Sequence, residues 1–139
     1  QLEKLPSFVE LRRENFAYLK TRLEGVPHLQ FFEACPESEP SWFGFLITLL
    51  SGAPISRNDL VKKLEASKIQ TRSLFAGNLT RHPCFESLRE GVEYRIAAPL
   101  VNTDAIMNNS FWIGVYPGMS KRELDFMAES VKASIFAKT

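Results

Sequence analysis

Two segments of this 139-residue chain carry more polar and aromatic side chains than packing alone requires. The first runs from Thr71 to Pro83 and holds Arg72, Asn78 and Arg81 at the expected end of a strand and in the loop after it. The planar guanidinium of arginine suits phosphate or carboxylate groups, and ligands often bind at such loops. Pairing of the two arginines with acidic surface residues is an equally good interpretation.

The second segment is short and aromatic. Gly44 stands among Trp42, Phe43 and Phe45. A glycine without a Cβ lets its backbone approach another group closely, which is useful at a contact surface. Because aromatic side chains also dominate protein cores, a core position is the favoured interpretation for Trp42 and Phe45 taken individually.

Composition and spacing alone identify no catalytic site. His28 and His82 lie in expected loops beside prolines, and neither has a metal-ligand partner at helical spacing, so we interpret each as a surface residue or a local cap. Cys35 and Cys84 are far apart in the sequence, which excludes a disulfide scaffold, a zinc ribbon and a self-contained iron-sulfur site. The glycine-rich signatures of Walker, Rossmann and hydrolase sites are also absent.

The overall composition predicts one folded domain over residues 1–139. The chain is 45% hydrophobic and 24% charged, with a net charge of +1. Its basic residues are scattered, which argues against nucleic acid or an anionic membrane as a partner. No apolar run approaches the roughly 18 residues that a membrane-spanning helix needs, so we expect no membrane span.

Hydrophobic periodicity predicts the elements that must position the two segments. A helix is expected over 7–24, ended by Gly25 and Pro27, and a final helix begins at a Ser120–Glu123 capping box. The apolar residues of this final helix share one face, which we expect to be buried: Leu124, Met127, Ala128, Val131 and Ile135. A third helix over 57–67 is capped by Ser56. Strands are expected at 29–32, 42–50, 69–75 and 111–116, and short helical turns at 83–88 and 102–107, the last capped by Asn102 or Thr103. This order predicts an α+β fold with a small, mostly antiparallel sheet and helices on one face.

Three stretches are specific when taken together: SWFGF at 41–45, IQTRSLFAGNLTR at 69–81 and SFWIGVYPG at 110–118. With the helix pattern of residues 13–23, they resemble the C-terminal part of the DegT-type nucleotide-sugar aminotransferase and dehydratase family. The resemblance covers nearly the whole chain and is greatest to the 3-dehydrases of lipopolysaccharide O-antigen synthesis. It implies the small C-terminal domain of a fold-type-I transferase that uses pyridoxal phosphate (PLP), with residues 1–24 as the interdomain helix.

The resemblance also implies an activity for a longer parent protein. Pyridoxamine phosphate (PMP) would remove the 3-hydroxyl of a CDP-linked 4-keto-6-deoxyhexose, and a two-iron two-sulfur cluster served by a separate reductase would deliver electrons. In that family the cofactor pocket, the base histidine and the cluster cysteines belong to a large upstream domain. We therefore expect this chain to bind no cofactor, to be inactive alone, and to come from a cytoplasmic homodimer. Its start at Gln1, directly in a helical pattern, is expected for a domain excised from a longer protein.

By position in the matching motifs, the resemblance assigns substrate contacts and no catalytic residue or metal ligand. The assigned residues are Trp42, Phe45, Arg72, Asn78 and Arg81. Relatives often carry an arginine where this chain has Ala105, which leaves the exact sugar open. Two alternatives remain open as well: a freestanding α+β module that binds a ligand or a protein, and the small domain of a nucleotide-sugar aminotransferase.

An isolated small domain exposes the apolar surface that normally packs on its large domain. We therefore expect a contiguous hydrophobic patch and self-association through it, seen as binding of a hydrophobic dye and a concentration-dependent sedimentation coefficient. A monodisperse monomer that binds no dye would contradict this expectation. The chain is also expected to show no PLP absorbance, and a visible band from bound PLP would place the cofactor pocket in this chain.

Overall fold

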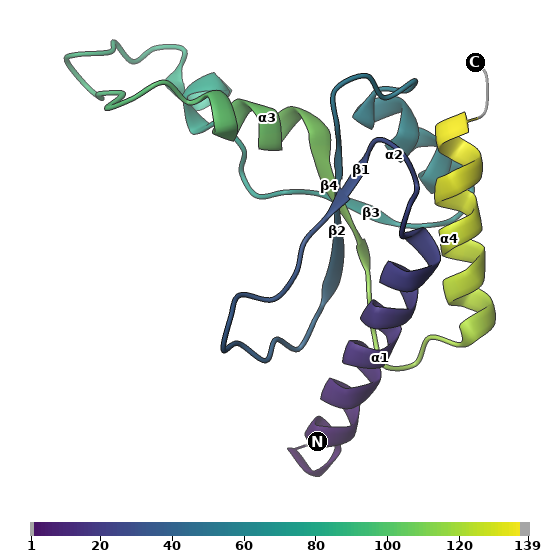
Figure 1. The fold of residues 1–139 in the computed structure, drawn as a ribbon. Helices are drawn as coiled ribbons and strands as arrows, with labels where there is room; N and C mark the ends of the chain where they lie inside the picture. Colours follow the sequence, from purple (N-terminus) through teal and green to yellow (C-terminus); the bar gives the residue numbers. More distant parts are fainter. Residues whose placement is uncertain (1, 137–139) are drawn as a thin grey trace.

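The computed structural model describes residues 2–136, with a four-stranded antiparallel sheet at its centre (Figure 1). Its strands lie in the order β1-β2-β4-β3. They are β1 (Leu29–Phe31), β2 (Gly44–Leu49), β3 (Thr71–Ser73) and β4 (Ser110–Gly114). The helices are α1 (Leu5–Leu23), α2 (Arg57–Ala66), α3 (Val101–Asn109) and α4 (Lys121–Phe136), with 3-10 turns at Leu2–Lys4, Leu79–Arg81 and Pro83–Phe85. The predicted α+β class and element order are confirmed.

The core lies between one face of the sheet and the helices α1, α2 and α4. Residues of β2 and β4 alternate, so that Phe45 opposite Ile113 and Ile47 opposite Phe111 turn toward the helices. The helices complete the core with Phe16, Leu19 and Leu23 of α1, Leu60 and Leu64 of α2, and Leu124, Met127, Ala128, Val131 and Ile135 of α4. The buried face predicted for the last helix is therefore confirmed. None of the helices in residues 2–136 is long and apolar enough to cross a bilayer.

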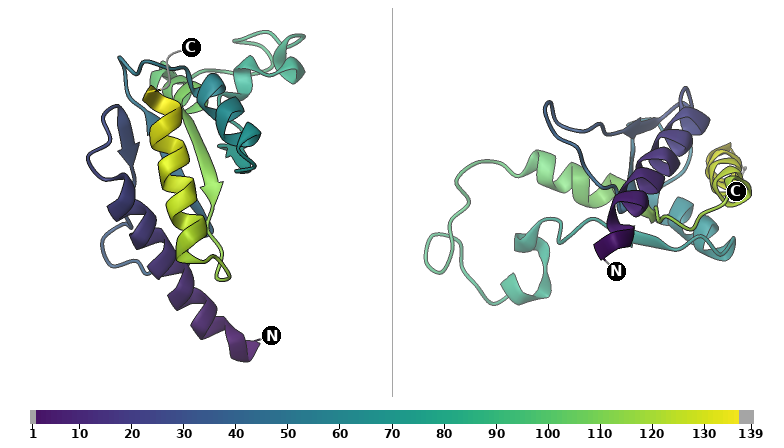
Figure 2. Two further views of the ribbon diagram at one scale, coloured as in Figure 1. Left: turned by 90° about the vertical axis from the view of Figure 1, so that its right-hand side faces the viewer. Right: turned by 90° about the horizontal axis from the view of Figure 1, so that it is seen from below.

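Within residues 2–136, no layer of helices covers the other face of the sheet, and we call it the open face. The chain from 74 to 109, which includes α3, projects on the side of the sheet away from α4, and we call it the arm (Figures 1 and 2). At the base of the arm, α3 contacts β2 and β4. The helices thus cover one face as predicted, except that α3 lies on the other side.

Local capping explains where α2 and α4 begin. The Ser56 hydroxyl accepts a hydrogen bond from the Asp59 N–H at 3.1 Å. Ser120 donates its N–H to the Glu123 carboxylate at 2.7 Å, and its hydroxyl accepts from the Glu123 N–H at 3.3 Å. Both predicted caps are confirmed.

Three boundary predictions on the arm side of the sheet are wrong. The helix α3 begins at Val101 with Leu100 at its N-cap, so the predicted caps at 102–103 lie inside it. Strand β3 covers three residues instead of seven, because the chain leaves the sheet after Ser73. The helix predicted at 83–88 is reduced to a 3-10 turn over Pro83–Phe85.

At Gly44 the alternation of side chains along β2 is interrupted. Trp42 stacks on Phe16 on the helix side, with ring centroids 4.0 Å apart, whereas Phe43 meets Trp112 edge to face on the open face. The Trp112 ring lies over the Gly44 backbone so closely that a Cβ there would be 2.2 Å from the Trp112 Cε3 atom. The close approach that this glycine suggested is confirmed, and the strand begins at Gly44 instead of Trp42.

Gly44→Ala is expected to destabilise the fold because its methyl group would displace the Trp112 ring. Overpacking of this kind lowers the free energy of unfolding by about 1–3 kcal/mol, measurable by urea denaturation. Gly114→Ala is the matched control, since Gly114 lies directly opposite in the sheet and a Cβ there would meet nothing within 4 Å. Equal stability losses in the two variants would contradict the role of the Gly44–Trp112 contact.

Candidate functional site

The three specific stretches of the sequence meet on the open face. The antiparallel register places Arg72 of β3 directly opposite Trp112 of β4, and the start of β2 flanks Trp112 on its other side. Phe43 and Phe75 both contact the Trp112 ring edge to face, with centroids 4.4 Å and 5.7 Å away. We call Phe43, Phe75 and Trp112 the aromatic cluster; the two phenylalanines are 61% and 81% exposed.

Arg72 adds an available positive charge to this cluster. No hydrogen bond or ion pair within residues 2–136 engages its guanidinium, although it lies near the Glu65 carboxylate. That carboxylate is committed elsewhere, because it accepts hydrogen bonds from the N–H and hydroxyl of Thr71 at 2.6 and 2.7 Å. These bonds, and to a smaller extent the charge of Arg72, lower the pKa of Glu65. The fork of Arg72 is therefore free to bind an anion.

A cavity of about 610 Å³ extends from the aromatic cluster toward α4. Its walls are mostly apolar, with Arg72 and Lys68 as cations and Glu123 as an anion. Its size and its few charged groups are typical of small-molecule sites. The Trp112 Nε1 atom is buried and has no hydrogen-bond acceptor in the described part of the chain. This N–H group can therefore donate a hydrogen bond to an acceptor that lies outside residues 2–136.

Trp42 and Phe45 do not belong to this face. Phe45 is 0% exposed and packs against Phe16 and Phe31 on the helix side of the sheet. A side chain with no exposed surface contacts no ligand, so the substrate contact assigned to Phe45 is corrected to a core position. Trp42 also lies on the helix side, stacked on Phe16 and packed against the core.

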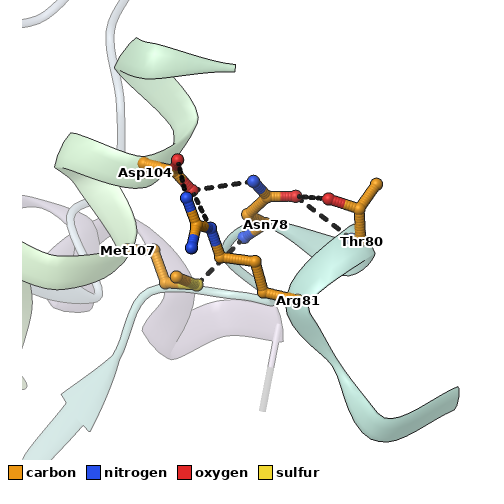
Figure 3. A network of polar contacts seen from close by, with 5 residues as sticks. All are labelled: Asn78, Thr80, Arg81, Asp104 and Met107. Carbon is orange, nitrogen blue, oxygen red and sulfur yellow. Dashed lines mark hydrogen bonds and ion pairs between the residues drawn. The ribbon is translucent and has the colours of Figure 1, made fainter. Parts of the chain in front are cut away.

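Asn78 and Arg81 meet Asp104 of α3 at the base of the arm (Figure 3). The Asn78 amide donates to Asp104 Oδ1 at 2.7 Å, and Arg81 donates to both carboxylate oxygens, through Nε at 2.8 Å and Nη2 at 2.6 Å. The Asn78 side-chain oxygen accepts hydrogen bonds from the N–H and the hydroxyl of Thr80. Asn78 thereby caps the 3-10 turn that follows it. Asn78 is only 3% exposed. Its polar atoms are therefore used inside the protein.

The charges in this network stabilise one another. Hydrogen bonds from Arg81, then from Asn78, lower the pKa of Asp104, and the charge of Arg81 adds to this effect. The same pairing with Asp104 raises the pKa of Arg81. Both groups are thus held in their charged forms at neutral pH.

Four residues around the open face and the arm were not predicted as site residues from the sequence: Phe43, Phe75, Trp112 and Asp104. Alternation along 42–50 would have placed Phe43 on the core face with Phe45, and only the interruption at Gly44 places it on the open face. Asp104 lies 23 residues after Arg81 in the sequence. The sequence offered one signal for this pair. Asp104 is an acidic residue on an expected helix, and the motif before it contains Arg81, which had no evident partner nearby in the sequence.

Histidines and cysteines take no part in the open face. His82 Nε2 lies 2.5 Å from the Ala76 carbonyl, a local contact at the base of the arm, and His28 has a φ of 64° in the turn before β1. Cys35 and Cys84 are exposed free thiols. Within residues 2–136 no group of three or more histidines, cysteines or carboxylates could hold a metal ion. The described residues therefore do not fit an iron-sulfur cluster.

Comparison with known proteins identifies the family. The model of the DegT/DnrJ/EryC1/StrS aminotransferase family matches residues 1–132. The chain belongs to this family. It is 49% identical, over 91% of its length, to the lipopolysaccharide biosynthesis protein RfbH of Salmonella typhimurium. It is 45% identical over its full length to dTDP-4-dehydro-2,6-dideoxy-D-glucose 3-dehydratase of Saccharopolyspora spinosa. The chain spans 28% and 29% of these two relatives.

Solved structures of longer proteins share the fold. The chain superimposes on E. coli GDP-4-keto-6-deoxy-D-mannose-3-dehydratase with bound hydrated PLP at a TM-score of 0.80, with 25% identity over 94% of this chain and 32% of that one. DesI in the presence of its TDP-sugar product gives a TM-score of 0.82 at 14% identity, with 97% of this chain and 33% of that one covered. The predicted resemblance to PLP-dependent transferases is confirmed.

Acid is expected to weaken the Asp104 network in a defined pH range. Because the folded-state pKa of Asp104 lies below the usual value of about 3.9, its contribution to stability is complete above that value and is lost as the pH falls through the lower folded-state pKa. Urea denaturation of wild type and Asp104→Asn between pH 7 and pH 2.5 measures this contribution to stability. The stability difference between the two should shrink toward the acid end; a difference that stays constant would contradict the assignment.

Proposed function

We propose that this chain is the small C-terminal domain of a PLP/PMP-dependent 3-dehydratase in deoxysugar and lipopolysaccharide biosynthesis, and that its open face forms part of the nucleotide-sugar site. The observation that carries the proposal is the meeting of the three specific stretches around Trp112 and Arg72. Relatives named as 3-dehydratases, at 45% and 33% identity, support this reaction class.

Arg72 and the aromatic cluster suit the two chemical parts of such a substrate. The guanidinium fork of Arg72 can bind phosphate oxygens through two hydrogen bonds. The exposed rings of Phe43 and Phe75 can pack against a nucleobase or the apolar face of a sugar. The arrangement therefore supports binding and orientation of a sugar nucleotide by this domain, with the chemistry elsewhere.

We propose a CDP-linked 4-keto-6-deoxyhexose as the substrate, following the resemblance in the sequence. Relatives named for GDP-linked and dTDP-linked sugars make these nucleotides the competing possibilities. Arg72 would bind the diphosphate that all three share, so it does not discriminate among them. The choice of base rests on groups that contact the base itself.

The cofactor belongs to the rest of the proposed parent protein. PLP or PMP supplies an electron sink for loss of the 3-hydroxyl when it is bound. None of the described residues that line the cavity is a histidine. Following the resemblance in the sequence, we assign the base, the cofactor pocket and any two-iron two-sulfur cluster with its reductase to the large domain. The parent is proposed to be a homo-oligomer.

Domain packing is the second contribution that we propose for this chain. The first turns of α1 project past the end of the sheet (Figure 2). Exposed apolar side chains follow this part of the helix: Leu2, Leu5, Phe8 and Leu11. An apolar stripe of this kind normally packs against another surface. We propose that the large domain covers it and that residues 1–24 form the interdomain helix.

Arg72→Ala in the full-length protein is expected to raise KM for the nucleotide sugar about 10- to 100-fold, the effect of losing charge-assisted hydrogen bonds. Arg72→Lys keeps the charge but loses the guanidinium fork, so its KM should lie between those of the wild type and Arg72→Ala. The assay measures release of the 3-hydroxyl from CDP-, dTDP- and GDP-linked 4-keto-6-deoxyhexoses. Arg122→Ala, an exposed arginine that does not line the cavity, is the control.

The outcomes separate the alternatives. Turnover of the dTDP or GDP sugar alone would overturn the choice of CDP. Transfer of an amino group to the sugar instead would identify an aminotransferase, and failure to turn over any of these sugars would contradict the proposed dehydratase activity. An unchanged KM in Arg72→Ala would remove the open face from the substrate site.

A further inference from the structure

At the base of the arm, helix α3 continues directly into strand β4. Helix α3 ends at Asn109 and β4 begins at the next residue, so Asp104 and Trp112 lie on the same α3–β4 unit. Arg57 of α2 donates to the last carbonyls of α3, those of Met107 at 2.9 Å and Asn108 at 3.3 Å. These bonds satisfy groups that a helix end leaves open.

The segment after β3 is fastened to this unit at two points one helical turn apart. Gly77, with a φ of +72°, lies against Met107, where a Cβ would be 2.4 Å from the Met107 Cγ atom. The Asn78 N–H lies 3.2 Å from the Met107 sulfur, and the Asn78 amide binds Asp104 (Figure 3). Arg81 then adds two charge-assisted bonds to the same carboxylate.

From this geometry we propose that Asp104 is a positioning residue of the nucleotide-sugar site: it fixes the chain that follows β3 and so places Phe75 against the Trp112 ring, beside Arg72. The inference rests on the proposed function. Strand β3 has only three residues, and Phe75 beyond it is largely exposed with the Trp112 ring as its aromatic partner. The anchor three residues later is therefore the main constraint on where Phe75 lies.

This proposal gives Asn78 and Arg81 the same role. The side-chain atoms of Asn78 are all hydrogen bonded within the network, and Arg81 uses Nε and Nη2 to hold Asp104. Arg72 is left with an uncommitted guanidinium fork beside the aromatic cluster. The motif that resembles a substrate-binding stretch thus divides into one ligand-binding arginine and one anchor.

The test compares Asp104→Asn with Glu93→Gln. An asparagine keeps the shape of the aspartate side chain but offers one acceptor oxygen, whereas Arg81 and Asn78 use both carboxylate oxygens of Asp104. The amino group of the asparagine would also face the N–H donors of these two residues. Glu93 pairs with Arg89 at 3.1 Å elsewhere on the arm, so its substitution removes a similar ion pair without touching the anchor. Both variants are made in the full-length protein and in this 139-residue chain.

The first readout is spectroscopic and needs no activity. The chain has two tryptophans, on opposite faces of the sheet, so the indole N–H signal of Trp112 is resolved from that of Trp42 by NMR and assigned with Trp42→Phe. Asp104→Asn should shift or broaden the Trp112 signal and leave that of Trp42 unchanged, and Glu93→Gln should change neither. An unmoved Trp112 signal in Asp104→Asn would overturn the proposal.

The second readout is the division between KM and kcat for the CDP-linked 4-keto-6-deoxyhexose. Loss of positioning should raise KM about tenfold with kcat per folded molecule within about twofold, whereas simple loss of folded protein would lower the apparent kcat alone. An unchanged KM in Asp104→Asn would contradict positioning. If wild type turns over no sugar, the proposed function fails, and the Trp112 signal still reports whether Asp104 anchors the segment.

Discussion

The contact between the Trp112 ring and the Gly44 backbone is the constraint on which the open face depends. Because Gly44 has no Cβ, the Trp112 ring can lie close against its backbone, where it makes edge-to-face contacts with Phe43 and Phe75. The same contact interrupts the alternation of β2, which sends Trp42 to the helix side. One glycine thus separates the exposed aromatic cluster from the aromatic part of the core.

The sheet therefore has two faces with different roles. The helix side is a closed core of aliphatic and aromatic residues, and it accounts for the stability of the domain. The open face and the arm carry exposed rings, an uncommitted arginine and a network that determines where the chain runs after β3. This division supports the proposal that the chain is a domain whose binding surface is completed by another part of a larger protein.

Local sequence patterns predicted what lies within single elements. The caps at Ser56 and Ser120, the buried face of α4 and the order of the elements all depend on neighbours within a few residues. The missed features depend on contacts distant in sequence: the register that joins Arg72 to Trp112 and the pairing of Arg81 with Asp104. A motif shows that residues belong together, but it does not reveal which of them face solvent.

The most direct test of the central claim is a crystal structure of the full-length protein with CDP bound. The account predicts that the Arg72 guanidinium lies within hydrogen-bond distance of the diphosphate and that Phe75 and Trp112 lose their solvent exposure. A structure in which the nucleotide binds far from the open face, with Arg72 still in solvent, would contradict it.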